Sequence, residues 1–160
     1  MDKLWEDGLA EVAIYEGRFP IYGRARKFDY VFVTVKETFN EEFQVKTNSY
    51  QRDDLYPVMK LNMFADIPTE NYPYHFLTSV FHRREDPFHL HKFTHSSQEW
   101  CGNTFKEFVP EGDELRYSWN SYWDGEGDGE ALLKSFPLLE DQLSYSLRSL
   151  RFENGLQFSY

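Results

Sequence analysis

Apolar and polar residues alternate along much of the chain, which is the pattern of a β-strand with one buried face. Within 59–67, for example, single polar residues separate Met59, Leu61 and Met63. Alternation or a strand-favouring composition predicts strands over 11–19, 28–38, 42–47, 59–67, 73–83, 87–99, 104–109, 115–123 and 129–136. The 28–35 run is apolar on both faces, so we expect it to be central in its sheet or covered by another element.

Short turn-forming segments separate the predicted strands. They stand at 40–41, 83–87, 102–103, 110–113 and 124–129. No helical pattern of about 10–15 residues lies between the early strands, which disfavours a parallel βαβ architecture. The pattern therefore predicts an all-β fold, an antiparallel meander that forms a partial or closed barrel.

One C-terminal helix is predicted over 138–151, packed on this sheet. Its leucines recur at helical spacing: Leu139, Leu143, Leu147 and Leu150. Pro137 suits the first turn of such a helix and Gly155 suits its end. The last residues, 156–160, alternate again like a strand. We therefore expect 1–160 to form a single β-rich domain, the N-terminal part of a longer native chain.

Charge and composition narrow the range of partners. The chain carries 27 Asp and Glu against 17 Lys and Arg, a net charge of −10. Such an acidic chain repels phosphate backbones, so we expect no nucleic acid partner. No apolar run reaches the roughly 18 residues of a transmembrane segment. Cys101 is the only cysteine and forms no internal disulfide, which leaves the redox compartment undetermined.

Aromatic residues are abundant, with 15 Phe, 11 Tyr and 4 Trp. Aromatic strand faces either pack together as core or line a cavity that binds an apolar small molecule. The ligand-binding candidates alternate along two of the predicted strands: Tyr74, Phe76, Tyr117, Trp119 and Trp123. Of these, Tyr117 and Trp119 are favoured for the lining or rim of a cavity.

Histidines offer a candidate metal site. His89 and His91 on one strand would place two imidazoles on the same face, about 6.6 Å apart, and such a pair can chelate zinc. A third ligand would have to come from a neighbouring strand, with His82 the first choice across the predicted turn at 83–87, and Asp86 and Glu85 are alternatives. The alternative is a solvated strand face that carries polar rings. We expect no zinc and no other cofactor.

Cys101 offers a candidate nucleophile, with His95 and Glu99 nearby in the sequence. A single cysteine between Trp100 and Gly102 is more typical of a small buried hydrophobe at a strand end. We therefore predict a buried, slowly reacting thiol and no catalytic residue.

The loop 124–130 offers a candidate calcium site. Asp124, Glu126 and Asp128 stand at alternate positions, with Gly129 at the sixth, as at the start of a calcium-binding loop. The twelfth position is Ser135, so the usual bidentate glutamate is missing. The alternative is a Gly-rich hairpin turn whose charges keep it solvated.

Several segments together resemble a known family. They are Trp5-Glu6-Asp7-Gly8-Leu9-Ala10-Glu11, Val45-Lys46-Thr47, Val58-Met59-Lys60-Leu61-Asn62, Tyr72-Pro73-Tyr74 and Ser96-Ser97-Gln98-Glu99-Trp100-Cys101-Gly102. The sequence resembles uncharacterised cell-envelope lipoproteins of Bacteroidota, many of which carry the label "septum formation inhibitor Maf". The Maf nucleotide pyrophosphatases are α/β proteins with an N-terminal Ser-x-Ser-Pro-Arg-Arg motif, which this chain lacks. The resemblance implies a periplasm-facing envelope location and supplies no catalytic residues.

These observations favour a non-enzymatic cell-envelope protein that binds a hydrophobic ligand or an envelope protein partner through an aromatic-lined sheet. One alternative is a hydrolase with a His-based or metal site around His89 and His91. Another is a structural domain completed by a missing C-terminal half.

Overall fold

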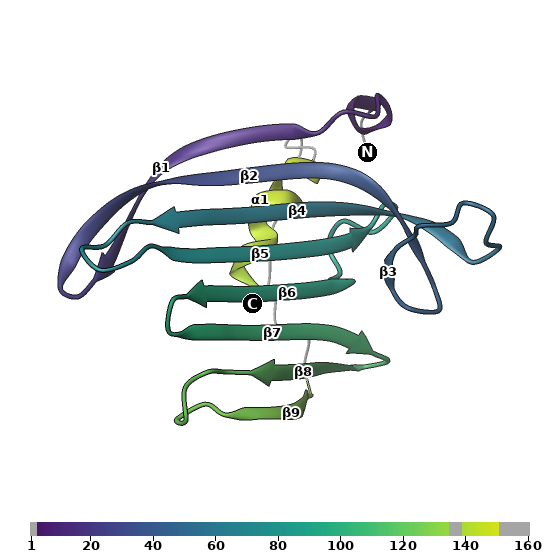
Figure 1. Ribbon diagram of the computed structural model, residues 1–160. Helices are drawn as coiled ribbons and strands as arrows, with labels where there is room; N and C mark the ends of the chain where they lie inside the picture. Colours follow the sequence, from purple (N-terminus) through teal and green to yellow (C-terminus); the bar gives the residue numbers. More distant parts are fainter. Residues whose placement is uncertain (1–2, 135–138, 151–160) are drawn as a thin grey trace.

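The fold is a single antiparallel sheet crossed on one face by a short helix (Figure 1). The computed structural model describes residues 3–134 and 139–150. The strands are β1 (Glu11–Ile21), β2 (Arg24–Asn40), β3 (Val45–Lys46), β4 (Leu55–Ile67), β5 (Tyr74–Arg83), β6 (Lys92–Glu99), β7 (Gly102–Glu111), β8 (Glu114–Asn120) and β9 (Asp128–Leu133). They pair in the order β1-β2-β4-β5-β6-β7-β8-β9, with β3 on the end of β2.

The predicted antiparallel meander is therefore confirmed, in its open form. Among the described residues β1 and β9 are the two edges and do not pair with each other, so the sheet is not closed into a barrel. The 28–35 run is expected to be central or covered. It is the middle of the longer β2, which lies between β1 and β4.

Two predicted strands include long segments that are not strand, and the predicted 115–123 strand runs past the end of β8 at Asn120. Of 42–47 only Val45–Lys46 is a strand, because the Asn40 side chain closes a turn: its Oδ1 accepts from the Phe43 amide at 2.9 Å and its Nδ2 donates to the Val45 carbonyl at 3.0 Å. The predicted 87–99 strand begins only at Lys92. Residues 84–91 instead form an irregular connection between β5 and β6.

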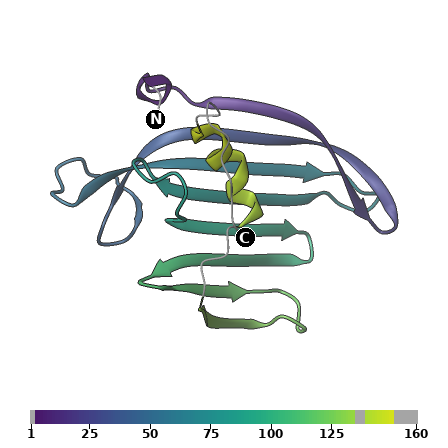
Figure 2. The same ribbon diagram turned by 180° about the vertical axis from the view of Figure 1, so that it is seen from behind.

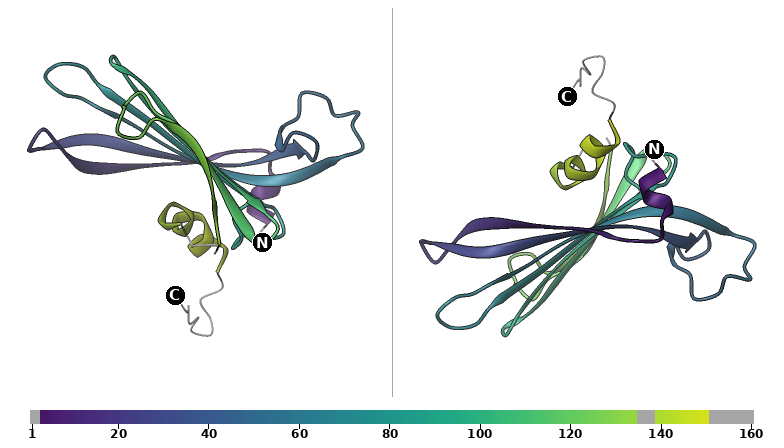
Figure 3. Two further views of the ribbon diagram at one scale, coloured as in Figure 1. Left: turned by 90° about the horizontal axis from the view of Figure 1, so that it is seen from below. Right: turned by 90° about the horizontal axis from the view of Figure 1, so that it is seen from above.

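Side chains alternate between two faces of the sheet, and only one face carries the helix (Figure 2). We call it the helix face. Its buried core consists of side chains that neighbour one another across the strands: Met59, Leu61, Met63, Val80, Leu90, Phe93, Leu115 and the helical Tyr145. The edge-on views show the strong twist of the sheet, with the helix to one side of it (Figure 3).

The C-terminal helix is shorter than predicted and buries a different set of residues. A 3₁₀ turn over Glu140–Gln142 leads into α1 (Leu143–Ser149), and the Leu139 amide donates to Gln142 Oε1 at 2.9 Å. Of the expected leucine stripe, Leu139 packs against the core, but Leu147 is 42% exposed whereas Tyr145 is 2% exposed. The predictions for Pro137, Leu138, Arg151, Gly155 and 156–160 fall outside the described residues.

Contacts at both ends of α1 fix its path across the strands. Tyr145 stacks on the buried His82 of β5, with 4.9 Å between ring centroids. Toward the C-terminal end, Arg148 forms an ion pair with Glu11 of β1 and donates to the Thr34 hydroxyl of β2 at 3.4 Å. No helix in the described part of the chain is long and apolar enough to span a membrane.

Glycines on both edge strands make room for aromatic rings on the helix face. Gly17 of β1 pairs with Phe28, and Gly129 of β9 pairs with Trp119. A Cβ atom on Gly17 would come within 2.6 Å of the Phe28 ring, and one on Gly129 within 2.5 Å of the Trp119 ring. Each ring therefore lies over the backbone of its edge strand, which only glycine permits.

Candidate functional site

A cavity lies on the helix face, in the part that α1 does not cover. Since α1 has only seven residues, it leaves the strands open toward the β1–β2 and β4–β5 turns (Figure 2). The cavity has a volume of about 380 Å³. We call it the aromatic cavity, and its lining residues are Phe19, Phe28, Tyr30, Ala65, Ile67, Phe76 and His95.

The strand register explains why a hollow forms here. Tyr30 of β2, Ala65 of β4 and Phe76 of β5 stand opposite one another in a row across three neighbouring strands. The alanine methyl group is much smaller than the rings on either side of it, so space remains above it. Ala65 itself is 3% exposed and forms the floor together with Ile67.

The polar groups in the lining are His95 and the Tyr30 phenol. The His95 ring lies along Phe76, with 6.1 Å between centroids and 20° between planes, and its Nδ1 is 2.8 Å from the Thr78 hydroxyl. Burial lowers the pKa of His95 and raises the pKa of Tyr30. Both groups are therefore neutral near pH 7, and the cavity wall carries no charge of its own.

One carboxylate stands close to this wall. Asp141, in the 3₁₀ turn before α1, is half-buried, and its charge raises the pKa of both Tyr30 and His95. Burial in turn raises the pKa of Asp141 itself, and His95 opposes that rise. Asp141 forms no ion pair with any residue that the structure describes.

The opposite end of the aromatic cavity is bounded by a closed ion pair. Arg26 stands across from Phe19 in the β1–β2 register. Its guanidinium donates to both carboxylate oxygens of Glu70, one of them at 2.8 Å, and Arg24 donates to Glu70 as well. This pairing holds the pKa of Glu70 at about 2, so the charges at this end remain paired at neutral pH.

The structure separates the predicted ligand-binding residues into two groups. Phe76 lines the aromatic cavity, and Tyr74 lies beside it, stacked on Phe76 with 6.1 Å between ring centroids. Tyr117 and Trp119 lie farther along the helix face and, with Lys106 and Glu126, line a second hollow of about 350 Å³.

The rings at the second hollow are held by stacking and by one hydrogen bond. Tyr117 stacks on Phe108 and on Trp119, with centroid separations of 4.4 and 4.8 Å. The Trp119 indole N–H donates to the Glu126 carbonyl at 3.0 Å. Trp123 lies in the turn after β8, is 51% exposed and lines neither hollow.

The expectation that His89 and His91 share a strand face is wrong, since both precede β6. His89 is exposed, with Nδ1 2.8 Å from Asp86 Oδ2, whereas His91 Nε2 lies 2.7 Å from the Tyr56 hydroxyl. His82 is fully buried and donates from Nδ1 to the His89 carbonyl at 3.0 Å. Burial lowers the pKa of His82 and of His91 to about 4. The described residues contain no group of three His, Cys, Asp or Glu side chains placed to hold a metal.

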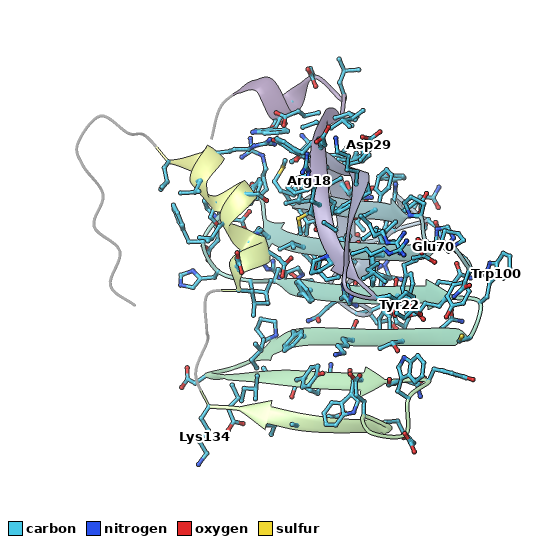
Figure 4. The ribbon with its side chains drawn as sticks, turned by 90° about the vertical axis from the view of Figure 1, so that its left-hand side faces the viewer. Arg18, Tyr22, Asp29, Glu70, Trp100 and Lys134 are labelled. Atoms are coloured by element: carbon cyan, nitrogen blue, oxygen red, sulfur yellow. The ribbon has the colours of Figure 1, made fainter. Side chains whose placement is uncertain are left out.

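The prediction of a buried Cys101 is also wrong. Glu99 pairs with Gly102, so Trp100 and Cys101 form the two-residue turn between β6 and β7, and the thiol is exposed. The hydroxyl of Tyr72 lies 3.0 Å from Cys101 Sγ. Tyr22, Glu70 and Trp100 come from neighbouring turns at this end of the sheet, the end that faces the viewer in Figure 4.

The candidate calcium-binding segment 124–130 spans the end of the hairpin connection between β8 and β9 and the first three residues of β9. Asp124, Glu126 and Asp128 are all exposed, and Glu126 Oε2 lies 3.6 Å from Lys106 Nζ. Hydrogen bonds close the loop, with the Gly127 amide donating to the Trp123 carbonyl at 2.9 Å and the Gly127 carbonyl accepting from Ser121. This geometry is that of the Gly-rich turn described above as the alternative to a calcium site.

Sequence reasoning did not assign Phe19, Phe28, Tyr30, His95 or Asp141 to a ligand site. A signal for part of the set was present, because Phe28 and Tyr30 belong to the run whose two faces are both apolar. Comparison with protein-family models, with curated proteins and with solved structures finds no match for this chain. The resemblance to envelope lipoproteins therefore stays a prediction.

Proposed function

We propose that this protein binds an apolar small molecule in the aromatic cavity and carries out no chemistry on it. The observation that carries the proposal is the row Tyr30–Ala65–Phe76, in which a small residue between two rings leaves about 380 Å³ of space. Ligand pockets of roughly 300–1,000 Å³ with a mostly apolar lining and few polar groups are the usual size and kind for small molecules.

The polar groups at the cavity support binding more than catalysis. Thr78 is the hydroxyl nearest to the His95 imidazole, but it is only 4% exposed and so is shielded from a ligand. A nucleophile must reach the reacting atom, and the base must reach the nucleophile. His95 and Tyr30 instead suit hydrogen bonds that orient a bound molecule.

As part of the same proposal, we infer a cell-envelope location, facing the periplasm. This inference rests on the family resemblance alone. An apolar carrier or sensor in that compartment would fit a cavity that opens at the surface of a sheet.

Filling the aromatic cavity tests the proposal. Ala65→Leu adds three carbon atoms above the floor, and it should weaken the binding of a neutral apolar dye such as Nile red by at least about tenfold. The matched control is Ala25→Leu, because Ala25 is exposed and lies outside the cavity lining.

Fluorescence titration of both variants and the wild type provides the measurement, and thermal unfolding verifies that each variant is folded. Equal dye affinity in wild type and a folded Ala65→Leu variant would show that the aromatic cavity is not the binding site.

A further inference from the structure

We propose that the ligand of the aromatic cavity is an apolar molecule that carries an organic cation, such as a quaternary ammonium group, held by the aromatic rings and attracted by the charge of Asp141. This inference rests on the proposed function, because it names the chemical class of the molecule that the cavity binds.

The rings provide the first argument. Phe19, Phe28, Tyr30 and Phe76 come from three strands and line one cavity. The face of an aromatic ring attracts a cation within about 6 Å of its centroid, and several rings around one site form the cage that recognises quaternary ammonium groups. Glycine at position 17 allows the Phe28 ring to lie low over β1, which keeps the cavity open on that side.

Asp141 provides the second argument. Its carboxylate is half-buried and, although it is not part of the cavity lining, it lies near enough for its charge to raise the pKa of Tyr30 and of His95. It forms no ion pair with the described residues. Burial raises its pKa, and the opposing contributions of His95 and of its own backbone amide are smaller, so no full counter-charge offsets the loss of solvation. A cation in the cavity would supply that counter-charge.

Two cations near the cavity already have carboxylate partners. Lys106 stands across from His95 in the β6–β7 register, and its ammonium group lies 3.6 Å from Glu126. Arg26 at the far end is paired with Glu70 through both oxygens. An anionic ligand would therefore meet Asp141 and a net charge of −10 with both of these cations engaged elsewhere.

Two probes of the same shape separate the effect of ligand charge on affinity from the effect of ligand size. Choline carries a trimethylammonium group, and 3,3-dimethylbutan-1-ol carries a neutral tert-butyl group in its place. We expect choline to bind the wild-type protein about tenfold more tightly, because cation–π attraction and Asp141 act on it alone. Nuclear magnetic resonance titration, followed at the residues that line the cavity, measures both affinities.

Asp141→Asn keeps the shape of the side chain and removes its charge. It should lower the affinity for choline several-fold and leave the affinity for the alcohol unchanged, which also verifies that the variant folds. Glu140→Gln is the matched control, because Glu140 is the exposed neighbour in the same 3₁₀ turn, and it should leave both affinities unchanged.

The remaining outcomes overturn distinct statements. Equal affinity of the wild type for the two probes would overturn the cation proposal and leave the aromatic cavity as the binding site. Tighter binding of choline that persists in Asp141→Asn would overturn the role of Asp141. Binding of neither probe, together with failure of the dye titration, would remove the proposed function as well.

Discussion

The helix face has two regions that share strands and register but differ in what their side chains do. Beneath α1, the side chains of Met59, Leu61 and Val80 pack against Tyr145 and are at most 2% exposed. Beside α1, rings surround Ala65 and leave a cavity. Flexible aliphatic and thioether side chains fill the space under a helix, whereas rigid rings around a small residue do not. The aromatic cavity thus results from where the helix ends and from one alanine.

The largest expected effect lies in the packed region. Tyr145→Ala should reduce the free energy of unfolding by about 4 kcal/mol, because it removes a fully buried ring from between α1 and His82. Leu147→Ala is the control on the exposed side of α1, and it should cost less than about 1 kcal/mol. Urea denaturation measures both, and similar losses for the two variants would contradict the assignment of the buried helix surface.

Acidification should also destabilise the protein through the packed region. The pKa of His82 in the folded protein, about 4, lies below its ordinary value of 6.5, so the unfolded chain binds more protons in this window. Stability is therefore complete above pH 6.5 and is lost as the pH falls toward 4, by about 3 kcal/mol for this histidine. His91 titrates in the same window and adds to the loss.

The substitution His82→Leu tests whether His82 causes this loss of stability at low pH. It should reduce the pH dependence of the unfolding free energy between pH 6.5 and 4 by about 3 kcal/mol and leave the contributions of His91 and His95 in place. The substitution His89→Ala, at an exposed histidine in the same connection, should leave that dependence unchanged. An unaltered slope in His82→Leu would show that His82 is not the group responsible.

The smallest effect compares the two edge glycines. Gly17→Ala and Gly129→Ala each push an aromatic ring away from its edge strand, and each should cost about 1 kcal/mol of stability. Only Gly17→Ala displaces a ring of the aromatic cavity, Phe28, so it alone should weaken ligand binding. Loss of ligand binding in both variants would contradict the assignment of the ligand site to the aromatic cavity, because Gly129 is far from its lining.

The sequence predicts the sheet well, because alternation with period two records which side of the pleat a residue occupies. It predicts the helix less well. The leucine spacing favours burial of a leucine stripe, whereas the residue that packs on His82 is Tyr145. Cys101 shows a third limit of prediction from a single sequence. Its apolar neighbours favour burial, but the β6–β7 register places it in a two-residue turn.

The candidate site depends on relations that a single sequence does not contain. Ala65 forms a cavity floor only because Tyr30 and Phe76 stand opposite it, which requires the register of three strands. The charge of Asp141 influences the pKa of His95 only because the chain returns across the sheet after β9. The predicted ligand residues Phe76 and Tyr74 lie at or beside this cavity, whereas Tyr117 and Trp119 lie at a separate hollow.

Two histidines, one in each region, provide the most direct test that the regions differ. His95 lines the aromatic cavity, and His82 lies in the packed region under Tyr145. In a titration with 3,3-dimethylbutan-1-ol and then with choline, the imidazole resonances of His95 should shift and saturate while those of His82 stay fixed. Unchanged His95 resonances, or equal shifts at both histidines, would contradict a ligand site in the aromatic cavity.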